Sequence, residues 1–495
     1  MIPFCRQCLA IATASLLLVR LSAAQGFGIP LTMQGVDRIT NHSASSRAVG
    51  GTTIGLSADV SAMFVNPASL AGLPGVQISL GGRASFFDLG QVQQYGPAKY
   101  YPNFSLVMEG LTDLVPDPEF DTLTTHTARD SVQRPFDTIG PNWSRKSNAN
   151  VPHQLMVAAA FSLGGLQWTA GAGVVEYADL DRYFQNNNVL SPAVNVQRPV
   201  PVPLVKNDSL SLPVQWYQYS QSREGSIRGY GGAIAVSLLP QVSLGLSGLL
   251  LKGSSDDTEA IHGRGKLVFY GSYFRLDPVA YRTVTTTVSE YSGAEFCLSG
   301  AFTGKFLTAG ISVKPPSRIT RTVERSVQAD TGTTTTRWSE QGEDRIDLPW
   351  RGMAGLSVAI RENLRIVLEY ELRPFDSAVY TAASGTESSP WLSAGLLRFG
   401  VEYRPWEWLA LRAGMADQAE VYQPEGNPLS GDPVEYAVYS AGAGLTFGGL
   451  RVDLAYMFAN ASYTDMFQNN VNLNTDRRQT AALTVSYLLP WTVQE

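Results

Sequence analysis

Residues 364–373, LRIVLEYELR, alternate between apolar and charged side chains. The even-numbered positions hold Leu, Ile, Leu, Tyr and Leu, whereas four of the five odd-numbered positions are charged. Successive side chains of a β-strand point to opposite faces, so this pattern predicts a strand with one apolar face and one charged face. Its ten residues are long for a globular strand, which averages about five or six, and fit the roughly 9–11 that a tilted membrane-spanning strand needs.

The same alternation recurs along the chain after residue 75. Fourteen segments show it, at 76–87, 152–163, 166–178, 227–239, 241–252, 290–303, 305–320, 346–360, 363–374, 391–404, 407–416, 435–447, 449–460 and 479–489. Six tight turns between them alternate without exception with seven long connections. This rhythm is typical of an even-stranded outer-membrane barrel with short periplasmic turns and long extracellular loops. A large secreted sandwich would also show alternating strands, but the rhythm favours an all-β, fourteen-stranded antiparallel transmembrane barrel.

The composition agrees with a membrane protein. Charged residues make up 16% of the chain, well below the roughly 25% of soluble globular proteins. Aromatic residues such as Trp350, Trp406 and Trp408 lie near the ends of predicted strands, as in the interfacial girdles of transmembrane barrels. The net charge is −6, and no basic cluster is present that would neutralise several phosphates, so we expect no nucleic-acid partner.

The N-terminus has the features of a secretory signal peptide. Arg6 supplies a positive charge, residues 9–19 form an apolar run, and residues 22–24 (SAA) form a small-residue cleavage site. We therefore predict removal of residues 1–24 and a location in the outer membrane of a Gram-negative-type cell. Of the three cysteines, only Cys297 would remain, so no intramolecular disulfide is expected.

The residues between the signal and the first predicted strand are rich in Gly, Ser and Ala, which permit tight turns and close backbone approach. A barrel of about fourteen strands is wider than the small barrels that side chains fill, so its lumen has room for a plug. We predict an N-terminal hatch over residues 25–75 and the barrel over 76–495. Pro67 favours an extended Asn66, which would redirect the chain from the hatch into the first strand.

Within this segment, residues 46–72 read SRAVGGTTIGLSADVSAMFVNPASLAG. The stretch resembles the N-terminal hatch signature of the long-chain fatty acid porin (FadL) family, in which a glycine-containing stretch and an acidic residue precede Asn-Pro-Ala. The matching positions are Gly50, Gly51, Asp59, Asn66, Pro67 and Ala68. With the fourteen strands and the plug-first order, the resemblance extends over the whole chain. Related branches that share the signature include the PorV- and PorQ-like proteins of type IX secretion.

The resemblance implies passive uptake of hydrophobic small molecules, such as long-chain fatty acids, through a hatch-gated barrel surrounded by outer-membrane lipids. Transport would depend on movement of the hatch around Asn66-Pro67-Ala68, and no cofactor is implied. The alternative is a PorV-like role, in which the barrel is a protein-binding shuttle or anchor of a secretion system. A transporter should have an apolar path past the hatch, whereas a shuttle should have a sealed lumen and a docking surface. A general diffusion porin would instead need a wide, charged constriction.

The first long connection offers an access surface for a hydrophobic ligand. Phe104, Val107, Met108 and Leu111 fall on one face at helical spacing. We expect these residues to form an apolar groove through which the ligand enters, or alternatively to pack on the rim of the barrel.

The third predicted strand, 166–178, changes phase near its end. Its apolar residues keep one phase as far as Val174, but Glu176 then occupies an outward position. A one-residue slip is the mark of a β-bulge, and Gly171 and Gly173 lie beside it. In the fatty acid porins a kink in the third strand opens the barrel wall, so the slip predicts a lateral exit between Gly171 and Glu176. The alternative is that the strand has left the membrane by Glu176.

Charged residues of both signs point inward from neighbouring late strands. They are Arg365, Glu369, Glu371, Arg398, Glu402, Arg404, Arg451 and Asp453. We expect these side chains to pair with one another and to anchor the hatch, and direct contact with a substrate carboxylate is the alternative.

The sequence gives no indication of an enzyme. The four histidines are His42, His126, His153 and His262. Each lies in the predicted hatch or in or beside a predicted loop, and none belongs to a recognisable nucleophile or metal-binding motif. We therefore expect no catalytic activity and no metal site.

Overall fold

The computed structural model of the chain describes the wall and much of the N-terminal segment. The described residues are 33–38, 43–55, 59–95, 136–139, 146–191, 212–269, 274–277, 281–419, 427–428, 434–467 and 470–490. The predicted signal peptide and the predicted access residues Phe104, Val107, Met108 and Leu111 lie outside these ranges.

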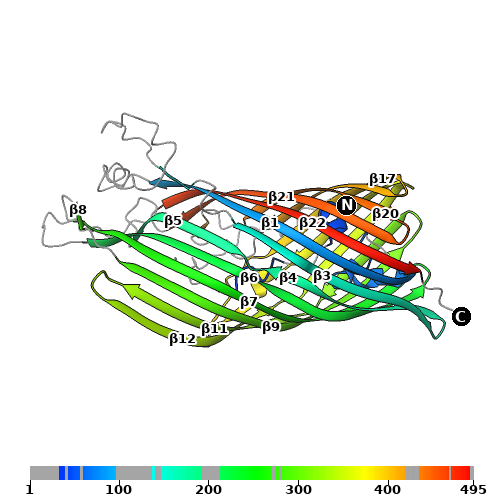
Figure 1. Ribbon diagram of the computed structural model, residues 1–495, viewed down its shortest axis with the longest axis horizontal. Coiled ribbons are helices and arrows are strands. Elements are labelled where there is room, and N and C mark those ends of the chain that lie inside the picture. Colours follow the sequence, from blue (N-terminus) through cyan, green and yellow to red (C-terminus); the bar gives the residue numbers. More distant parts are fainter. Residues whose placement is uncertain are drawn as a thin grey trace, which may run out of the picture.

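Fourteen antiparallel strands close into a barrel whose last strand pairs with its first (Figure 1). In order around the wall they are β1 (Gly75–Tyr95), β3 (Lys146–Leu163), β4 (Leu166–Asp179), β6 (Leu212–Leu239), β7 (Val242–Phe269), β9 (Arg282–Thr303), β10 (Leu307–Lys314), β13 (Arg351–Arg361), β14 (Leu364–Arg373), β17 (Ala394–Trp406), β18 (Leu409–Ala419), β20 (Glu435–Phe447), β21 (Leu450–Phe467) and β22 (Asn470–Pro490). Each strand pairs with the next in this order. A closed sheet leaves no open edge. Each of the fourteen predicted segments overlaps a different strand of this wall.

Several strand ends were predicted wrongly on the side of the long connections, where strands continue further than the sequence indicated, as β21 and β22 do within 461–478. The connection predicted at 253–289 is largely occupied by the ends of β7 and β9. The predicted strand 305–320 is divided between β10 and β11 (Ser317–Asp330), and β11 forms a hairpin with β12 (Thr335–Leu348). These extensions are rich in Ser, Thr and charged residues, so they lack the apolar alternation that a sequence pattern detects.

Short elements add to the sheet at the end of the barrel that carries the long connections (left in Figure 1). They are β2 (Phe136–Ile139), β5 (Arg182–Ser191), β8 (Phe274–Asp277), β15 (Val379–Thr381), β16 (Glu387–Ser388) and β19 (Asn427–Pro428), with the 3-10 helix η4 (Phe375–Ser377) before β15. The opposite end carries the tight turns, such as the one between β3 and β4. The strands therefore continue into the long connections at one end of the barrel, whereas tight turns end them at the other.

The outward side chains of the fourteen strands form an apolar belt. Leu250 is 64% exposed, Leu454 51% and Leu368 40%. At the tight-turn edge of this belt, Trp406 and Trp408 stack with their ring centroids 5.5 Å apart. Continuous apolar surface on this scale is not found on monomeric soluble proteins, and an apolar belt with an aromatic edge is what transmembrane barrels present to lipid.

The described N-terminal residues lie inside the ring of strands (blue in Figure 1). They form the helix α2 (Ala44–Ala48) and the 3-10 helices η1 (Val60–Ala62) and η2 (Pro67–Gly72), and all residues of α2 and η1 are buried. α2 packs against β18, β20, β21 and β22, whereas η2 packs against β4, β6, β7 and β9. Among the described residues, no helix has both the length and the apolar character needed to cross a membrane.

An arginine in the apolar belt should destabilise the protein far more than one elsewhere on the outer surface. Leu454→Arg should lower the free energy of unfolding in phospholipid vesicles by about 2–4 kcal/mol, because its guanidinium would lie in hydrocarbon. Trp338→Arg is the control, since Trp338 on β12 is 50% exposed but lies beyond the belt. That change should cost below about 1 kcal/mol. Equal losses of unfolding free energy for the two variants, measured by guanidinium chloride denaturation, would show that the belt does not face lipid.

Candidate functional site

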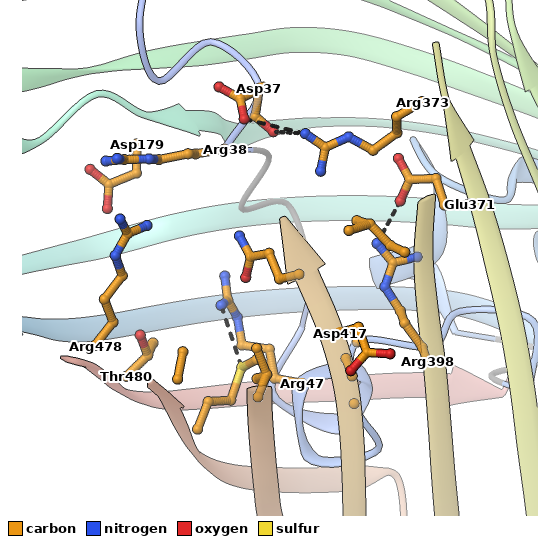
Figure 2. A pocket seen from close by; sticks show the side chains of 18 of the residues that line it. Asp37, Arg38, Arg47, Asp179, Glu371, Arg373, Arg398, Asp417, Arg478 and Thr480 are labelled. Carbon is orange, nitrogen blue, oxygen red and sulfur yellow. Dashed lines mark hydrogen bonds and ion pairs between the residues drawn. The ribbon is translucent and has the colours of Figure 1, made fainter. Parts of the chain in front are cut away.

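A cavity of about 230 Å³ lies in the lumen between two parts of the N-terminal segment. Asp37 and Arg38 line it from one part of this segment, and Arg47, Gly50 and Gly51 line it from the other. Figure 2 shows Asp37, Arg38 and Arg47 around it. Strands distant in the sequence, including β1, β14, β17 and β22, supply the wall between them. A molecule in this cavity would touch the wall and the N-terminal segment at once.

The cavity combines apolar surface with many cationic groups. Nine basic side chains line it: Arg38, Arg47, Arg83, Arg182, Lys314, Arg351, Arg373, Arg398 and Arg478. Five acidic side chains line it: Asp37, Asp179, Asp181, Glu371 and Asp417. The apolar lining includes Val65, Phe87, Met353, Leu396, Val438 and Met457. This combination suits a ligand with an apolar body and an anionic group, because guanidinium groups bind carboxylates through strong, charge-assisted hydrogen bonds.

Gly50 allows the N-terminal segment to lie directly against the wall. Its φ of +76° is left-handed, and a Cβ at this position would be 2.7 Å from the carbonyl oxygen of Met415 and 2.8 Å from that of Phe399. The neighbouring Gly51 also has a positive φ, of +84°, but a Cβ there would meet only the side chain of Arg398, at 3.5 Å. The two predicted glycines therefore differ, since Gly50 is required by both backbone conformation and space.

The predicted motif Asn66-Pro67-Ala68 is fixed to the inner wall through its backbone. Pro67 is at the first position of η2, where a missing N–H leaves no hydrogen bond unmade. The N–H of Ala68 donates to Ser299 Oγ at 2.7 Å, and its carbonyl accepts from Ser243 Oγ at 3.1 Å. The motif therefore places a short 3-10 turn against β7 and β9.

Two further wall residues bind the carbonyl oxygen of Val65, immediately before this motif. Ser312 Oγ donates to it at 2.7 Å and Cys297 Sγ at 3.4 Å. Both side chains are buried, Cys297 with 2% of its surface exposed. Neither residue was predicted from the sequence, because a small inward side chain fits the strand pattern equally well whether or not it contacts the N-terminal segment. Their inward strand phase was the only available signal.

Glu369 and Arg398, both predicted lumen residues, meet the N-terminal segment together. One oxygen of the fully buried Glu369 accepts from the N–H groups of Thr53 at 2.7 Å and Ile54 at 3.1 Å. The other oxygen lies 3.0 Å from Arg398. A buried carboxylate needs such donors, and charge-assisted hydrogen bonds are about twice as strong as neutral ones. This cluster fixes Thr53 and Ile54, which follow α2 in a non-helical conformation.

The other predicted lumen charges contact different partners. Arg365 donates to the carbonyl oxygen of Gly55 at 3.0 Å. Arg451 lies 3.5 Å from one oxygen of Asp59, whose other oxygen caps η1. Glu402 binds two arginines of the wall, at 2.7 and 2.9 Å. Asp59 therefore connects η1 to the wall, whereas Glu402 forms ion pairs with arginines of the wall strands.

Arg47 places a buried positive charge in the lining of the cavity. Its side chain is 7% exposed, and Nη1 lies 3.9 Å from the sulfur of Met457 (Figure 2). Burial, together with the positive charge of Arg83, lowers the pKa of the Arg47 guanidinium to about 10. The group therefore remains cationic at neutral pH, and burial makes an anionic neighbour more favourable for it.

The predicted slip in the third wall strand is present, but the predicted opening is not. The pairing of β4 with β6 shifts by one residue between Glu176 and Ala178. From Gly171 to Gly173, however, β4 pairs continuously with both β3 and β6. A bulge bends a strand and leaves one residue unpaired without separating the strand from its neighbours. The lateral exit expected between Gly171 and Glu176 is therefore absent from this structure.

The wall divides just beyond this point. The ladder between β3 and β4 ends at Gln154↔Val175. Beyond a register shift, β3 pairs with β1 again from Asn150 to Lys146. Arg83 of β1 spans the division on the lumen side, with two nitrogens each 2.5 Å from Glu176 and one of them 3.0 Å from Asp179. The bulge turns Glu176 inward to this arginine, which is why its outward sequence phase was misleading.

A methyl group at Gly50 should loosen the N-terminal segment more than one at Gly51. Gly50→Ala combines a left-handed backbone with a clash against two carbonyl oxygens, and we expect a loss of at least about 2 kcal/mol in local stability. Gly51→Ala is the matched control, with similar backbone strain and no such clash, at about 1 kcal/mol. Limited proteolysis of the folded barrel should cut within residues 43–55 faster in Gly50→Ala. Equal protection of the two variants would contradict this account.

No protein-family model and no curated protein matches the chain. Solved structures do match it. A FadL homologue from Pseudomonas aeruginosa is 13% identical over 90% of this chain and 98% of its own, with a TM-score of 0.57. The monoaromatic hydrocarbon channel CymD is 10% identical over 91% of this chain and 98% of its own, with a TM-score of 0.53. The Pseudomonas putida toluene transporter TodX is 12% identical over 91% of this chain and 99% of its own, with a TM-score of 0.52. The chain therefore has the barrel fold of the FadL homologue and of these hydrocarbon channels.

Proposed function

We propose that the chain is an outer-membrane channel for the passive uptake of hydrophobic molecules that carry an acidic group, such as long-chain fatty acids. The observation that carries the proposal is the cavity between the two parts of the N-terminal segment, which unites apolar surface with arginines. A ligand carboxylate can bind arginines that now bind carboxylates of the protein, whereas a neutral hydrocarbon cannot. The apolar belt supports a location in the outer membrane, reached with the help of the predicted signal peptide.

Two structural relatives are named for hydrophobic cargo, one as a monoaromatic hydrocarbon channel and one as a toluene transporter. Their names support a hydrophobic cargo in general. The charged side chains of the cavity are what favour an amphipathic acid over a neutral aromatic compound in this chain. The proposed preference for acids therefore rests on the charged side chains of the cavity.

In this proposal the N-terminal segment, residues 25–75, acts as the hatch. Backbone groups of Thr53, Ile54, Val65 and Ala68 bind wall side chains. The neutral hydrogen bonds of Val65 and Ala68 contribute only about 0.5–1.5 kcal/mol net each, because water or another partner can replace them. Those of Thr53 and Ile54 to the Glu369 carboxylate contribute about 1.5–3 kcal/mol each. A ligand that gains charge-assisted contacts in the cavity can therefore supply enough free energy to displace several of them.

We also propose a lateral exit, now placed at the division between β3 and β4 rather than at Gly171. Arg83 and Asp179 line the cavity and also belong to the ion pairs that bridge this division. A ligand carboxylate that replaced both Glu176 and Asp179 at Arg83 would remove the bridge. The apolar part of the ligand would then have a route from the cavity towards the belt.

Equilibrium binding to the detergent-purified protein tests the class of cargo. A radiolabelled long-chain fatty acid should bind saturably, and its methyl ester, which has the same chain and no charge, should bind about tenfold more weakly. Equal affinities would reject the acid preference and leave a general hydrophobic channel. No binding of either compound to a correctly folded barrel would reject uptake and favour the protein-binding, PorV-like role.

Cys297 reports whether the hatch moves. Its thiol is buried behind Val65, so a maleimide should react slowly while the hatch is seated. In protein with Cys5→Ser and Cys8→Ser, saturating fatty acid should raise the rate of Cys297 labelling several-fold. Asn66→Ala combined with Pro67→Ala should raise this rate without ligand, because the turn that seats the hatch is weakened. Bound fatty acid with unchanged labelling would contradict a moving hatch.

A further inference from the structure

The inward face of β14 presents three charged side chains in a row, Glu369, Glu371 and Arg373, because alternate residues of a strand point to the same side. Glu369 binds the backbone of residues 53–54 below the cavity. Arg373 lies 3.3 Å from Asp37 on the other side of the cavity. Glu371 is between them and lines the cavity itself. A single strand therefore binds both parts of the N-terminal segment, with the candidate ligand space between them.

Arg398 of β17 joins the two glutamates. Its Nη1 lies 3.0 Å from Glu369, and its Nη2 lies 2.5 Å from Glu371. The side chain of Glu369 is 0% exposed, whereas that of Glu371 is 17% exposed at the edge of the cavity (Figure 2). The same guanidinium therefore binds one carboxylate that holds the N-terminal segment and one that faces the ligand space.

We propose that Glu371 is an internal counter-ion, which binds Arg398 when the cavity is empty and which an acidic ligand displaces. This inference rests on the proposed function and names the residue that sets its preference for acids. The fork of a guanidinium fits carboxylates in particular, so a ligand acid can take the Nη2 position that Glu371 holds. A neutral ligand cannot do so, because it would leave the buried charge of Arg398 less well compensated.

Displacement of Glu371 would also connect the cavity to both parts of the N-terminal segment. Arg398 would divide its hydrogen bonds between the ligand and Glu369, and so weaken the cluster that holds residues 53–54. The released Glu371 would be next to Arg373 on the same strand face and would compete there with Asp37. One exchange of carboxylates at Arg398 thus reaches the contacts on both sides of the cavity.

Substitutions of the two glutamates that bind Arg398 separate ligand preference from hatch seating. Glu371→Gln removes the internal counter-ion, so the affinity for the fatty acid should rise about tenfold while the affinity for its methyl ester stays unchanged. Cys297 should remain protected in this variant without ligand. Glu369→Gln replaces the charged acceptor of residues 53–54 with a neutral amide, which accepts weaker hydrogen bonds, so labelling of Cys297 should rise without ligand while the acid-to-ester ratio changes little.

The outcomes distinguish this inference from the proposed function. If the wild-type protein binds neither acid nor ester, the uptake proposal fails and the counter-ion has no ligand to exclude. If the wild-type protein prefers the acid but Glu371→Gln leaves that affinity unchanged or lower, the counter-ion is wrong and uptake stands. Should Glu371→Gln not fold, Glu371→Asp retracts the carboxylate by one methylene, and it should raise the acid affinity to a smaller extent. No rise in this variant would likewise overturn the inference.

Discussion

A carboxylate without water around it has to be surrounded by donors, and Glu369 meets this requirement with groups from two distant parts of the chain. Arg398 approaches from the neighbouring wall strand, and the N–H groups of Thr53 and Ile54 approach from the lumen. Backbone N–H groups are free for such a role outside regular helices and sheets, or in the first turn of a helix. Thr53 and Ile54 follow α2 in a non-helical conformation, which leaves their N–H groups available to this buried charge.

The rest of the lumen obeys the same requirement. A row of alternating charges follows the inner wall and ends on the N-terminal segment: Arg404, Glu402, Arg412, Asp453, Arg451 and Asp59. Buried ion pairs add little net stability, because the loss of hydration offsets their attraction, but a charge left without its partner is costly. Such a row fixes where each partner must lie more than it strengthens the assembly. That property suits an interior segment which has to be placed accurately and also displaced.

The wall could be predicted from the sequence because alternation and tight turns are local properties. Residues 364–373 indicated a strand from their own composition, and β14 occupies those residues. The contacts inside the lumen could not be predicted in this way, since Glu369 and Thr53 are 316 positions apart and meet only because of the tilt and radius of the closed wall. The inward position of Glu176 could not be predicted for a related reason, because a bulge depends on how a strand pairs with its neighbours.

The first and last wall strands pair without interruption from Gly75↔Pro490 to Tyr95↔Asn470. Contacts between residues so distant in the sequence form late, because the loop that they close contains almost the whole chain. Until β22 arrives, the sheet is an open trough with two unpaired edges. Residues 43–55 and 59–74 contact wall strands from β4 round to β22, so we expect them to lie in that trough before the ring closes. Closure by β22 would then enclose a segment that the other wall strands already hold.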